Sequence, residues 1–444
     1  MRGGSPMESK LFEAFKKKLK SQSVPVLTKF NGEEEEFLSA ANIFTLVLSR
    51  ARELRKLGLS KGQVLLKEPS DFNTIVDFLA CVKLGATYFP HLKEEQLKFV
   101  QQYGGEYDFE RIDNGYILKG KLNWHHKDIY YPLVVATSGT KNRKIVSYHE
   151  KGLLFQLSSH EKVFRKFNFN HKLSLLPKNH CFGMVLDLLL GVFMGNYITF
   201  LDRDFTLASL KRIFKFNEID FITCVPKHID MLNEFAKKDS SLKSSLKGVT
   251  CFYGGAHLSS KSYDRAKQYF YAIVEGYGLT EAGPGVLINR QPIPGVEVSL
   301  VDQKLCLSSP SIGHYCGGNE RLHTQDYFKK IKDKYIFLGR EGDFIKNRSG
   351  KFESLFEIQE KINLRSENEI LFVRDREKLI LVDLYESKQL SQGLLEWVEK
   401  NYCAVIEVKH LPRSKSLRKI SEFKCKSKED AINQIIKLEG SWVS

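Results

Sequence analysis

The sequence lacks the patterns that identify several common protein classes. Its 8 cysteines form no CxxC pair and show no zinc-like spacing, which argues against a zinc module or a disulfide framework. We therefore expect free thiols in a reducing, cytoplasmic environment. Its longest apolar stretch, Met184 to Leu201, is interrupted by Asp187 and by glycines, so it is a poor candidate for a bilayer span. A buried helix followed by a strand fits this stretch better.

A dense block of one charge is also missing. Lys and Arg number 68 and Asp and Glu 53, but the surplus of cations is spread along the chain. The clusters from Lys16 to Lys20 and from Lys424 to Lys428 have no interleaved aromatic residues. This pattern predicts a solvated basic surface that attracts anionic substrates, and it disfavours specific nucleic-acid binding.

Strand and helix patterns alternate along most of the 444 residues. Apolar runs at 63–66, 131–136, 172–176, 197–201, 221–225, 249–253 and 272–275 read as strands, with helical periodicity at 40–57, 71–84, 180–193 and 207–216. This alternation predicts an α/β fold with a doubly wound parallel sheet. We expect a large domain over 8–338 and a small α+β domain over 341–444.

A run of hydroxyls and cations, Thr-Ser-Gly-Thr-Lys-Asn-Arg-Lys at 137–144, follows a buried strand. Backbone N–H groups, hydroxyls and Lys144 in such a turn can bind phosphate oxygens, and Gly139 allows close approach. The spacing is not that of a Walker A loop. A polar surface hairpin is the alternative for this segment on its own.

Two more strand patterns end in glycine-rich segments, at 254–256 and 276–281. In a parallel sheet the carboxyl ends of strands share one edge, so these segments and 137–144 are expected to meet in one crevice. There Glu281 could hold a magnesium ion, Thr280 a phosphate oxygen and Tyr277 the face of a base. Turn glycines and a core tyrosine are the alternatives.

The order of these motifs resembles the adenylate-forming (AMP-binding) superfamily of acyl- and aryl-CoA synthetases, luciferases and nonribosomal adenylation domains, over about 131–422. Residues 137–144 are similar to its phosphate loop, 253–256 to its adenine and acyl-pocket loop, and 277–281 to its Tyr-Gly-x-Thr-Glu signature. Further similar segments are the Pro-x-Pro-Gly strand at 291–302, His-Thr-Gln-Asp at 323–326, Gly-Arg at 339–340 and Lys-Ile at 419–420.

The resemblance implies ATP-dependent activation of a carboxylic acid to an acyl-adenylate with pyrophosphate release, and transfer to coenzyme A, with ATP, Mg²⁺ and coenzyme A as cofactors. It also implies a small C-terminal domain that moves about a hinge at 340–343. The implied catalytic residues are Lys419, Thr280, Glu281 and His180, with Glu281 as the metal ligand. The implied nucleotide-binding residues are Thr137, Ser138, Gly139, Thr140, Lys144, Gly254, Gly255, Ala256, Tyr277, Gly278, Asp326 and Arg340.

One register stays open near the C-terminus. Lys419 matches the mobile lysine of the family because Ile420 follows it, at the cost of one extra residue after Pro412. Without that insertion Arg418 takes the place of Lys419.

The substrate can be narrowed in class. Cys181 stands where amino-acid-activating relatives have an aspartate, and a buried ammonium without a partner is costly, so an α-amino acid is disfavoured. We expect a mostly apolar pocket lined by His180, Phe182, Gly183, Pro226, Tyr253 and Gly283. A capping or core histidine is an equal interpretation of His180. In length, and in its Lys-Ile-Ser at 419–421, the chain resembles the o-succinylbenzoate–CoA ligases of menaquinone synthesis.

Two other functions remain. One is a ligase that loads an acyl carrier protein, whose acidity would suit the basic surface. The other is a non-catalytic nucleotide- or nucleic-acid-binding protein on the same fold. The oligomeric state is left open by the sequence.

Overall fold

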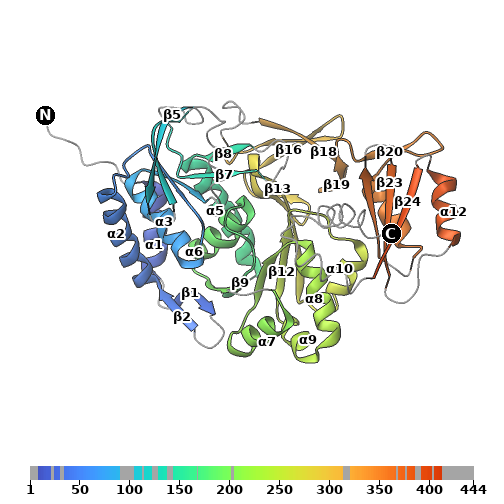
Figure 1. Cartoon of the computed structure of the whole chain (residues 1–444), viewed down its shortest axis with the longest axis horizontal. Coiled ribbons are helices and arrows are strands. Elements are labelled where there is room, and N and C mark those ends of the chain that lie inside the picture. The colour runs from blue at the N-terminus through green and yellow to red at the C-terminus, as the bar shows by residue number, and fades with distance from the viewer. Residues whose placement is uncertain are drawn as a thin grey trace, which may run out of the picture.

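The computed structural model describes residues 9–21, 25–30, 35–90, 105–112, 115–122, 129–137, 144–167, 169–201, 205–313, 321–366, 369–375, 378–385, 392–402 and 405–412. Two large sheets with flanking helices make up the first two thirds of the chain, and three small sheets follow (Figure 1). The predicted α/β class is confirmed.

A nine-stranded sheet holds the centre of the molecule, in the order β15-β14-β13-β12-β11-β9-β10-β1-β2. Its strands are β1 (Pro25–Phe30), β2 (Glu35–Ser39), β9 (His171–Ser174), β10 (Tyr197–Leu201), β11 (Phe221–Cys224), β12 (Thr250–Gly254), β13 (Ala272–Leu279), β14 (Gly283–Ile288) and β15 (Gln291–Pro292). The run from β1 to β13 pairs in parallel, so the carboxyl ends of its strands share an edge. Its helices include α7 (Leu207–Phe216), α8 (Pro226–Lys238), α9 (Ser240–Leu246) and α10 (Ser260–Ala266).

A six-stranded sheet lies beside it, in the order β5-β6-β3-β4-β7-β8. Its strands are β3 (Val64–Lys67), β4 (Thr87–Pro90), β5 (Gly105–Ile112), β6 (Gly115–Leu122), β7 (Leu133–Ala136) and β8 (Ile145–Tyr148). The helices of this part are α1 (Lys10–Lys20), α2 (Ala40–Lys56), α3 (Asp71–Leu84), α5 (Glu150–Phe164) and the 3₁₀ turn η2 (Arg165–Phe167). Side-chain caps begin several of them: Ser9 and Ser39 accept the backbone N–H groups of Phe12 and Asn42, which satisfies donors that a helix start leaves open.

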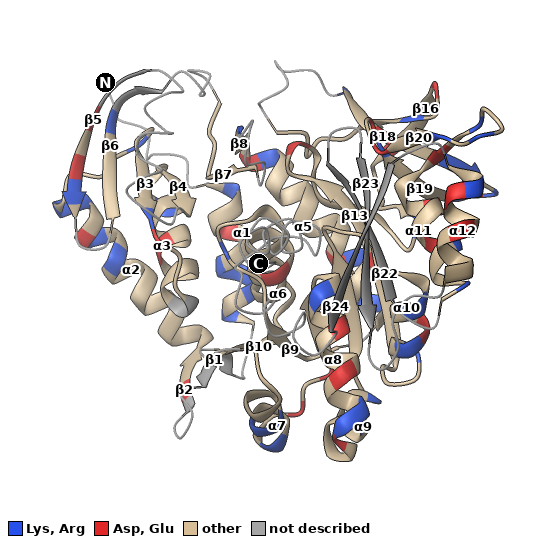
Figure 2. Ribbon diagram, turned by 45° about the vertical axis from the view of Figure 1, so that its right-hand side comes forward, with Lys and Arg blue, Asp and Glu red and all other residues tan. Residues whose placement is uncertain are grey.

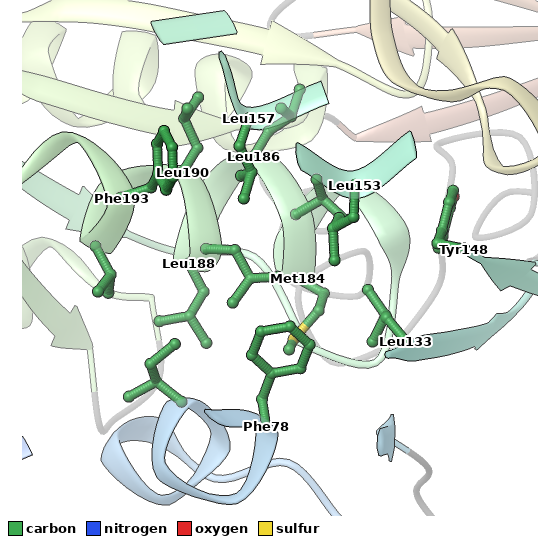
Figure 3. Close-up of a cluster of buried hydrophobic side chains, with 14 of the residues drawn as sticks. Phe78, Leu133, Tyr148, Leu153, Leu157, Met184, Leu186, Leu188, Leu190 and Phe193 are labelled. Atoms are coloured by element: carbon green, nitrogen blue, oxygen red, sulfur yellow. The ribbon is translucent and has the colours of Figure 1, made fainter. Parts of the chain in front are cut away.

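The main core lies between the two sheets. Helix α3, strands β7 and β8, helix α5 and the segment 182–194 all contribute apolar side chains to it (Figure 3). Phe78, Leu153, Met184 and Leu188 are all buried within this cluster. No helix in the described ranges combines the length and apolar character needed to cross a bilayer.

Smaller sheets follow residue 296. The first contains β16 (Glu297–Val301), β17 (Lys304–Ser308), β18 (Arg321–Ile331) and β19 (Lys334–Arg340). The next two contain β20 (Phe344–Lys346) with β21 (Phe352–Ser354), and β22 (Glu369–Asp375) with β23 (Lys378–Tyr385) and β24 (Val405–Pro412). Helices α11 (Leu355–Asn363) and α12 (Gln392–Asn401) accompany them. The division into domains at 338 and 341 stays a prediction.

Two elements differ from the sequence-based expectation. The expected helix at 180–193 is a π-helix over Phe182–Leu189 (η3) that continues as α6 (Leu190–Met194). The expected loop at 276–281 is wrong for most of its length, because β13 continues to Leu279 before the 3₁₀ turn η4 (Thr280–Ala282). The extension has a physical cause: beyond the parallel ladder, β13 pairs antiparallel with β14, where Tyr277 faces Leu287.

Charged side chains are dispersed over the surface. Figure 2 shows Lys and Arg on helices on several sides of the molecule, including α2, α7 and α9, with Asp and Glu among them. Many of the cations are paired; Lys211 of α7, for example, lies 2.7 Å from Asp239. On the described part of the surface, cations and anions are therefore interspersed.

Candidate functional site

The carboxyl end of β12 lies beside the middle of β13 in the large sheet. Gly254 is the parallel neighbour of Gly276. A Cβ atom on Gly254 would stand 2.7 Å from the carbonyl oxygen of Gly276, and one on Gly276 would stand 2.7 Å from the ring of Phe252. Close approach of the two backbones therefore requires Gly254, and the ring of Phe252 leaves little room for a side chain at Gly276. Gly255 follows with φ of +81°, a conformation that L side chains rarely adopt, and Ala256 comes next.

A buried carboxylate sits beside these strand ends. Asp326, on β18, is 1% exposed, and its Oδ2 accepts a hydrogen bond of 2.6 Å from the hydroxyl of Tyr277. Arg340, directly opposite on β19, donates from Nε to Oδ1 at 2.7 Å and from Nη2 to Oδ2 at 3.3 Å. The Arg340 side chain is 60% exposed, so the cluster is open to solvent on one side.

This arrangement shifts the pKa values of Tyr277 and Arg340. Burial, and then the neighbouring Asp326 carboxylate, raise the pKa of Tyr277 well above its usual value, so the phenol stays protonated and donates. The hydrogen bond that Arg340 donates to Asp326 raises the pKa of Arg340. The structure thus brings together three of the predicted nucleotide-binding residues, with a carboxylate able to accept hydrogen bonds from hydroxyl groups such as those of a ribose.

A second group of predicted residues meets at the turn after β13. Lys144 Nζ lies 3.8 Å from Glu281 Oε1. The ends of the predicted phosphate loop are joined by two hydrogen bonds: Thr137 N donates to Lys144 O at 2.8 Å, and Lys144 N donates to Thr137 Oγ1 at 2.9 Å. Ser138, Gly139 and Thr140 lie outside the described residues. The described part therefore places an ammonium, a carboxylate and a hydroxyl next to one another.

Thr280 has two partners that no motif indicated. The hydroxyl of Tyr148, on β8, donates to the carbonyl oxygen of Thr280. Cys181 Sγ lies 3.4 Å from Thr280 Oγ1, and burial raises the pKa of the Cys181 thiol, which keeps it neutral. All four residues of β8 are buried, and nothing in the sequence indicates the partner of Tyr148.

The residue pair before the π-helix and the first turn of that helix form the other side of this group. His180 begins it, with its carbonyl oxygen accepting from Met184 N at 2.7 Å. Phe182 meets Phe252 edge to face, with ring centroids 5.4 Å apart. Gly183 is required, because a Cβ there would stand 2.1 Å from the carbonyl oxygen of Pro177.

The other expected pocket residues are dispersed. Pro226 begins α8, Tyr253 is the buried residue before Gly254, and Gly283, with φ of +84°, packs against Gln156. Gly278, on β13, packs against the backbone of Pro284 and Gly285, which is a structural reason for this glycine.

Few of the described residues bear on the predicted metal site and the predicted mobile cation. The described ranges hold no group of three or more His, Cys, Asp or Glu residues able to bind a metal by themselves. Mg²⁺ in nucleotide sites commonly takes one or two carboxylates and completes its shell with phosphate oxygens and water, so the single carboxylate of Glu281 fits it. Lys419 and its alternative Arg418 lie outside the described residues.

Comparison with known proteins points to the same superfamily that the motifs resemble. The model of the AMP-binding enzyme family matches residues 126–316. The chain is 30% identical over 172 residues to the AMP-binding domain-containing enzyme iboA of Amanita muscaria, covering 32% of each chain. It is 30% identical over 156 residues to the probable 4-coumarate–CoA ligase 1 of Dictyostelium discoideum, covering 34% of this chain and 28% of that protein. The matches span about a third of the length of these relatives.

Solved structures extend the likeness of fold to nearly the whole chain. Wild-type E. coli MenE, with a bound analogue of OSB-AMS, superimposes with a TM-score of 0.68 at 16% identity, covering 97% of this chain and 100% of that one. ATP-bound MatB of Rhodopseudomonas palustris gives a TM-score of 0.74 at 15% identity, covering 91% and 96%. The MenE o-succinylbenzoate–coenzyme A synthetase of Bacillus subtilis, in complex with AMP, gives 0.69 at 14% identity, covering 90% and 94%.

The match of the AMP-binding enzyme model to residues 126–316 and the fold shared with MatB and MenE agree with the resemblance inferred from the motifs.

Proposed function

We propose that the protein is an ATP-dependent acid–thiol ligase that forms an acyl-adenylate and transfers the acyl group to coenzyme A. The observation that carries the proposal is the pairing of two clusters at one sheet edge. One holds Tyr277, Asp326 and Arg340 around a buried carboxylate, and the other holds Lys144 and Glu281 beside Thr280. The first suits the hydroxyls of a ribose and the second suits phosphates and their metal.

The proposed reaction has two steps. An oxygen of the acid's carboxylate bonds to the α-phosphorus of ATP, and the bond from that phosphorus to the pyrophosphate oxygen breaks. The thiol sulfur then bonds to the acyl carbon, the thiol loses its proton, and AMP leaves. Phosphoryl transfer of this kind needs positioning and charge stabilisation rather than an enzyme nucleophile.

Each described residue then has one task. Asp326 and Arg340 orient the ribose, and Tyr277 holds the Asp326 carboxylate in place by its hydrogen bond. Lys144 and the hydroxyl of Thr280 face the negative charge of the phosphates. Mg²⁺ held by Glu281 supplies charge neutralisation at the phosphate oxygens. Lys419, or Arg418 in the alternative register, is proposed as the cation brought in by the domain 341–444.

An aromatic acid is the proposed substrate class, with an o-succinylbenzoate-like acid as the first choice. Support comes from the neutral Cys181 thiol against Thr280 and from the ring of Phe182, which offer no partner for an α-ammonium group. Further support comes from the names of ligases that share the fold or part of the sequence, which refer to o-succinylbenzoate, anthranilate and 4-coumarate.

The test is pyrophosphate release from ATP and Mg²⁺ with o-succinylbenzoate, anthranilate, 4-coumarate, benzoate, octanoate and alanine. We expect release with an aromatic acid and none with alanine. Glu281→Gln is expected to lower kcat/KM by about 100-fold or more. Glu234→Gln is the matched control, because Glu234 pairs with Arg265 at 3.5 Å away from the site, and it should leave kcat/KM unchanged.

Two further comparisons separate the alternatives. Lys419→Ala and Arg418→Ala identify which cation acts, since the loss should follow one of them. Coenzyme A and an acyl carrier protein, offered separately with the same acid, identify the acceptor. If ATP binds but no acid gives pyrophosphate, the ligase proposal fails and the non-catalytic alternative gains.

A further inference from the structure

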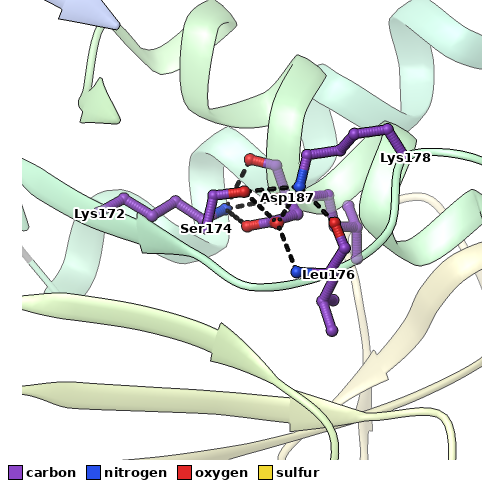
Figure 4. A network of polar contacts seen from close by, with 6 residues as sticks. Lys172, Ser174, Leu176, Lys178 and Asp187 are labelled. Atoms are coloured by element: carbon purple, nitrogen blue, oxygen red, sulfur yellow. Dashed lines mark hydrogen bonds and ion pairs between the residues drawn. The ribbon is translucent and has the colours of Figure 1, made fainter. Parts of the chain in front are cut away.

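A buried cluster of charges lies directly behind the acid side of the site. Asp187, in the middle of the π-helix, is fully buried. Its Oδ2 accepts from Lys178 Nζ at 2.7 Å and from Ser174 Oγ at 2.6 Å (Figure 4). Lys178 Nζ also donates to Ser174 Oγ at 2.6 Å and to the carbonyl oxygen of Leu176. These contacts tie the end of β9, the segment that follows it and the π-helix into one unit.

A second ammonium completes the cluster. Lys172 Nζ lies 3.1 Å from Asp187 Oδ1 and donates to the carbonyl oxygens of Leu186 and Asp187 at 2.9 and 2.8 Å. Burial lowers the pKa of Lys172 to about 8, even though Asp187 acts to raise it. Burial alone would raise the pKa of Asp187, but the two lysines lower it below its usual value. The cluster therefore holds one anion and two cations away from water.

Stability does not explain such a cluster. Moving charges out of water costs several kcal/mol per ion, and well-packed apolar residues often replace buried ion pairs with no loss. The neighbouring positions of the π-helix are apolar and buried, so an apolar residue would suit position 187 by packing alone. What the ions supply is a fixed geometry between segments that packing alone leaves free to slide.

The geometry that they fix reaches the site within a few residues. Lys178 and Asp187 bracket the turn that carries Cys181, whose Sγ is 3.4 Å from Thr280 Oγ1. They also bracket Phe182, whose ring is 3.4 Å from where a Cβ on Gly254 would stand. π-Helical turns are uncommon and often occur at functional sites, and this one begins at Phe182.

We propose that Lys178 and Asp187 are positioning residues for acid binding: their buried ion pair holds the turn 179–182 so that Cys181 and Phe182 stay against Thr280 and Gly254. The inference rests on the proposed ligase function. It deepens that proposal by assigning the acid side of the site to a charge cluster that contacts neither acid nor nucleotide.

Lys178→Met tests the proposal, and Lys67→Met is its matched control. Lys67 Nζ lies 2.6 Å from Asp77, which also pairs with Arg50, so each change removes one of two cations from a buried aspartate. The pyrophosphate assay with o-succinylbenzoate, or whichever acid of the panel reacts in the parent, gives KM for acid and for ATP. We expect Lys178→Met to raise KM for the acid about tenfold and to leave KM for ATP within about twofold. Lys67→Met should change neither.

A second readout needs no activity. The rate at which iodoacetamide alkylates Cys181, followed by peptide mass spectrometry, reports how firmly the turn is held. We expect about a tenfold faster rate in Lys178→Met, because local opening exposes the thiol, and the parent rate in Lys67→Met. Equal Cys181 rates in folded Lys178→Met and parent would overturn the inference whether or not the ligase proposal survives.

Two outcomes need separate treatment: a Lys178→Met variant that does not fold, and a parent protein without pyrophosphate release. If Lys178→Met does not fold, Ser174→Ala keeps all three charges and removes the shared hydroxyl. We expect Ser174→Ala to raise both the KM for the acid and the alkylation rate of Cys181, each by about threefold. A parent without pyrophosphate release would refute the proposed function alone, while the Cys181 rates would still decide whether the cluster holds the turn.

Discussion

Replacing Tyr277 by Phe is expected to destabilise the protein more than replacing Arg340 by Ala, although Arg340 makes the ion pair. Tyr277→Phe removes one hydroxyl and leaves the ring packed against Phe328, with ring centroids 4.9 Å apart. The lost hydrogen bond is short, 2.6 Å, and its acceptor is a carboxylate. Hydrogen bonds to charged groups contribute about 1.5–3 kcal/mol, so we expect a loss of about 2 kcal/mol in the free energy of unfolding.

Arg340 is worth less because water reaches it. Its side chain is 60% exposed, and exposed ion pairs contribute about 0.2–1 kcal/mol after solvent screening. In Arg340→Ala, water can approach the Asp326 carboxylate from the vacated side while the Tyr277 hydroxyl stays in place. We therefore expect a loss of about 1 kcal/mol or less, and a smaller dependence on salt for Tyr277→Phe than for Arg340→Ala.

The assay is urea unfolding followed by far-UV circular dichroism on the parent, the two single variants and a double-mutant cycle with Asp326→Ala. The cycle should give a coupling of about 2 kcal/mol between positions 277 and 326. The reasoning is refuted if Arg340→Ala costs more than Tyr277→Phe. A coupling near zero would show that the hydroxyl and the carboxylate do not interact in solution.

Two further predictions concern buried groups near the site. Gly183→Ala places a Cβ 2.1 Å from the carbonyl oxygen of Pro177 and should lower the free energy of unfolding by about 1–3 kcal/mol. In the control Gly393→Ala, in α12, the added Cβ meets no atom within 4 Å, so stability should not fall. Equal melting temperatures of the two variants would contradict this. Burial lowers the pKa of His160 to about 4, so the unfolded chain, with its pKa near 6.5, binds a proton that the folded protein refuses. Stability should therefore fall as the pH drops from about 6.5 towards 4, and His160→Leu should reduce that slope by up to about 1.4 kcal/mol per pH unit; an unchanged slope in urea unfolding would rule out this role.

Helices and strands were predictable from the sequence where a single local pattern was enough to identify them. Continuous apolar runs located β10 and β11 almost to the residue, and helical periodicity located α2 and α3. These signals depend on neighbours in the chain, so tertiary contacts do not alter them. The extension of β13 was missed because its second half pairs with β14 rather than β12, and a change of partner along one strand leaves no mark on its periodicity.

The site was predictable to a similar extent. A glycine at a strand end, such as Gly254, is visible in the sequence, and the structure shows that close backbone approach requires it there. Tyr148 and the Arg340–Asp326 pair depend on which strands lie next to each other, and a motif match supplied the second but not the first. Ser138, Gly139, Thr140 and Lys419 lie outside the described residues, so their assignments stay predictions.

Asp187 illustrates why the acid side of the site was the hardest part to infer. In sequence it is one acidic residue inside an apolar run, which indicates no more than that the run is not a membrane span. Its partners Lys172 and Lys178 look like two more cations of a Lys-rich chain, since neither position differs in pattern from exposed lysines. The nucleotide side is built from strand-end residues that local rules identify, whereas the acid side is held by charges 9 and 15 residues apart in sequence that meet out of contact with water. A pocket placed by such a cluster can change its lining residues without changing its support, because the three charged side chains contact one another, Ser174 and backbone carbonyl oxygens.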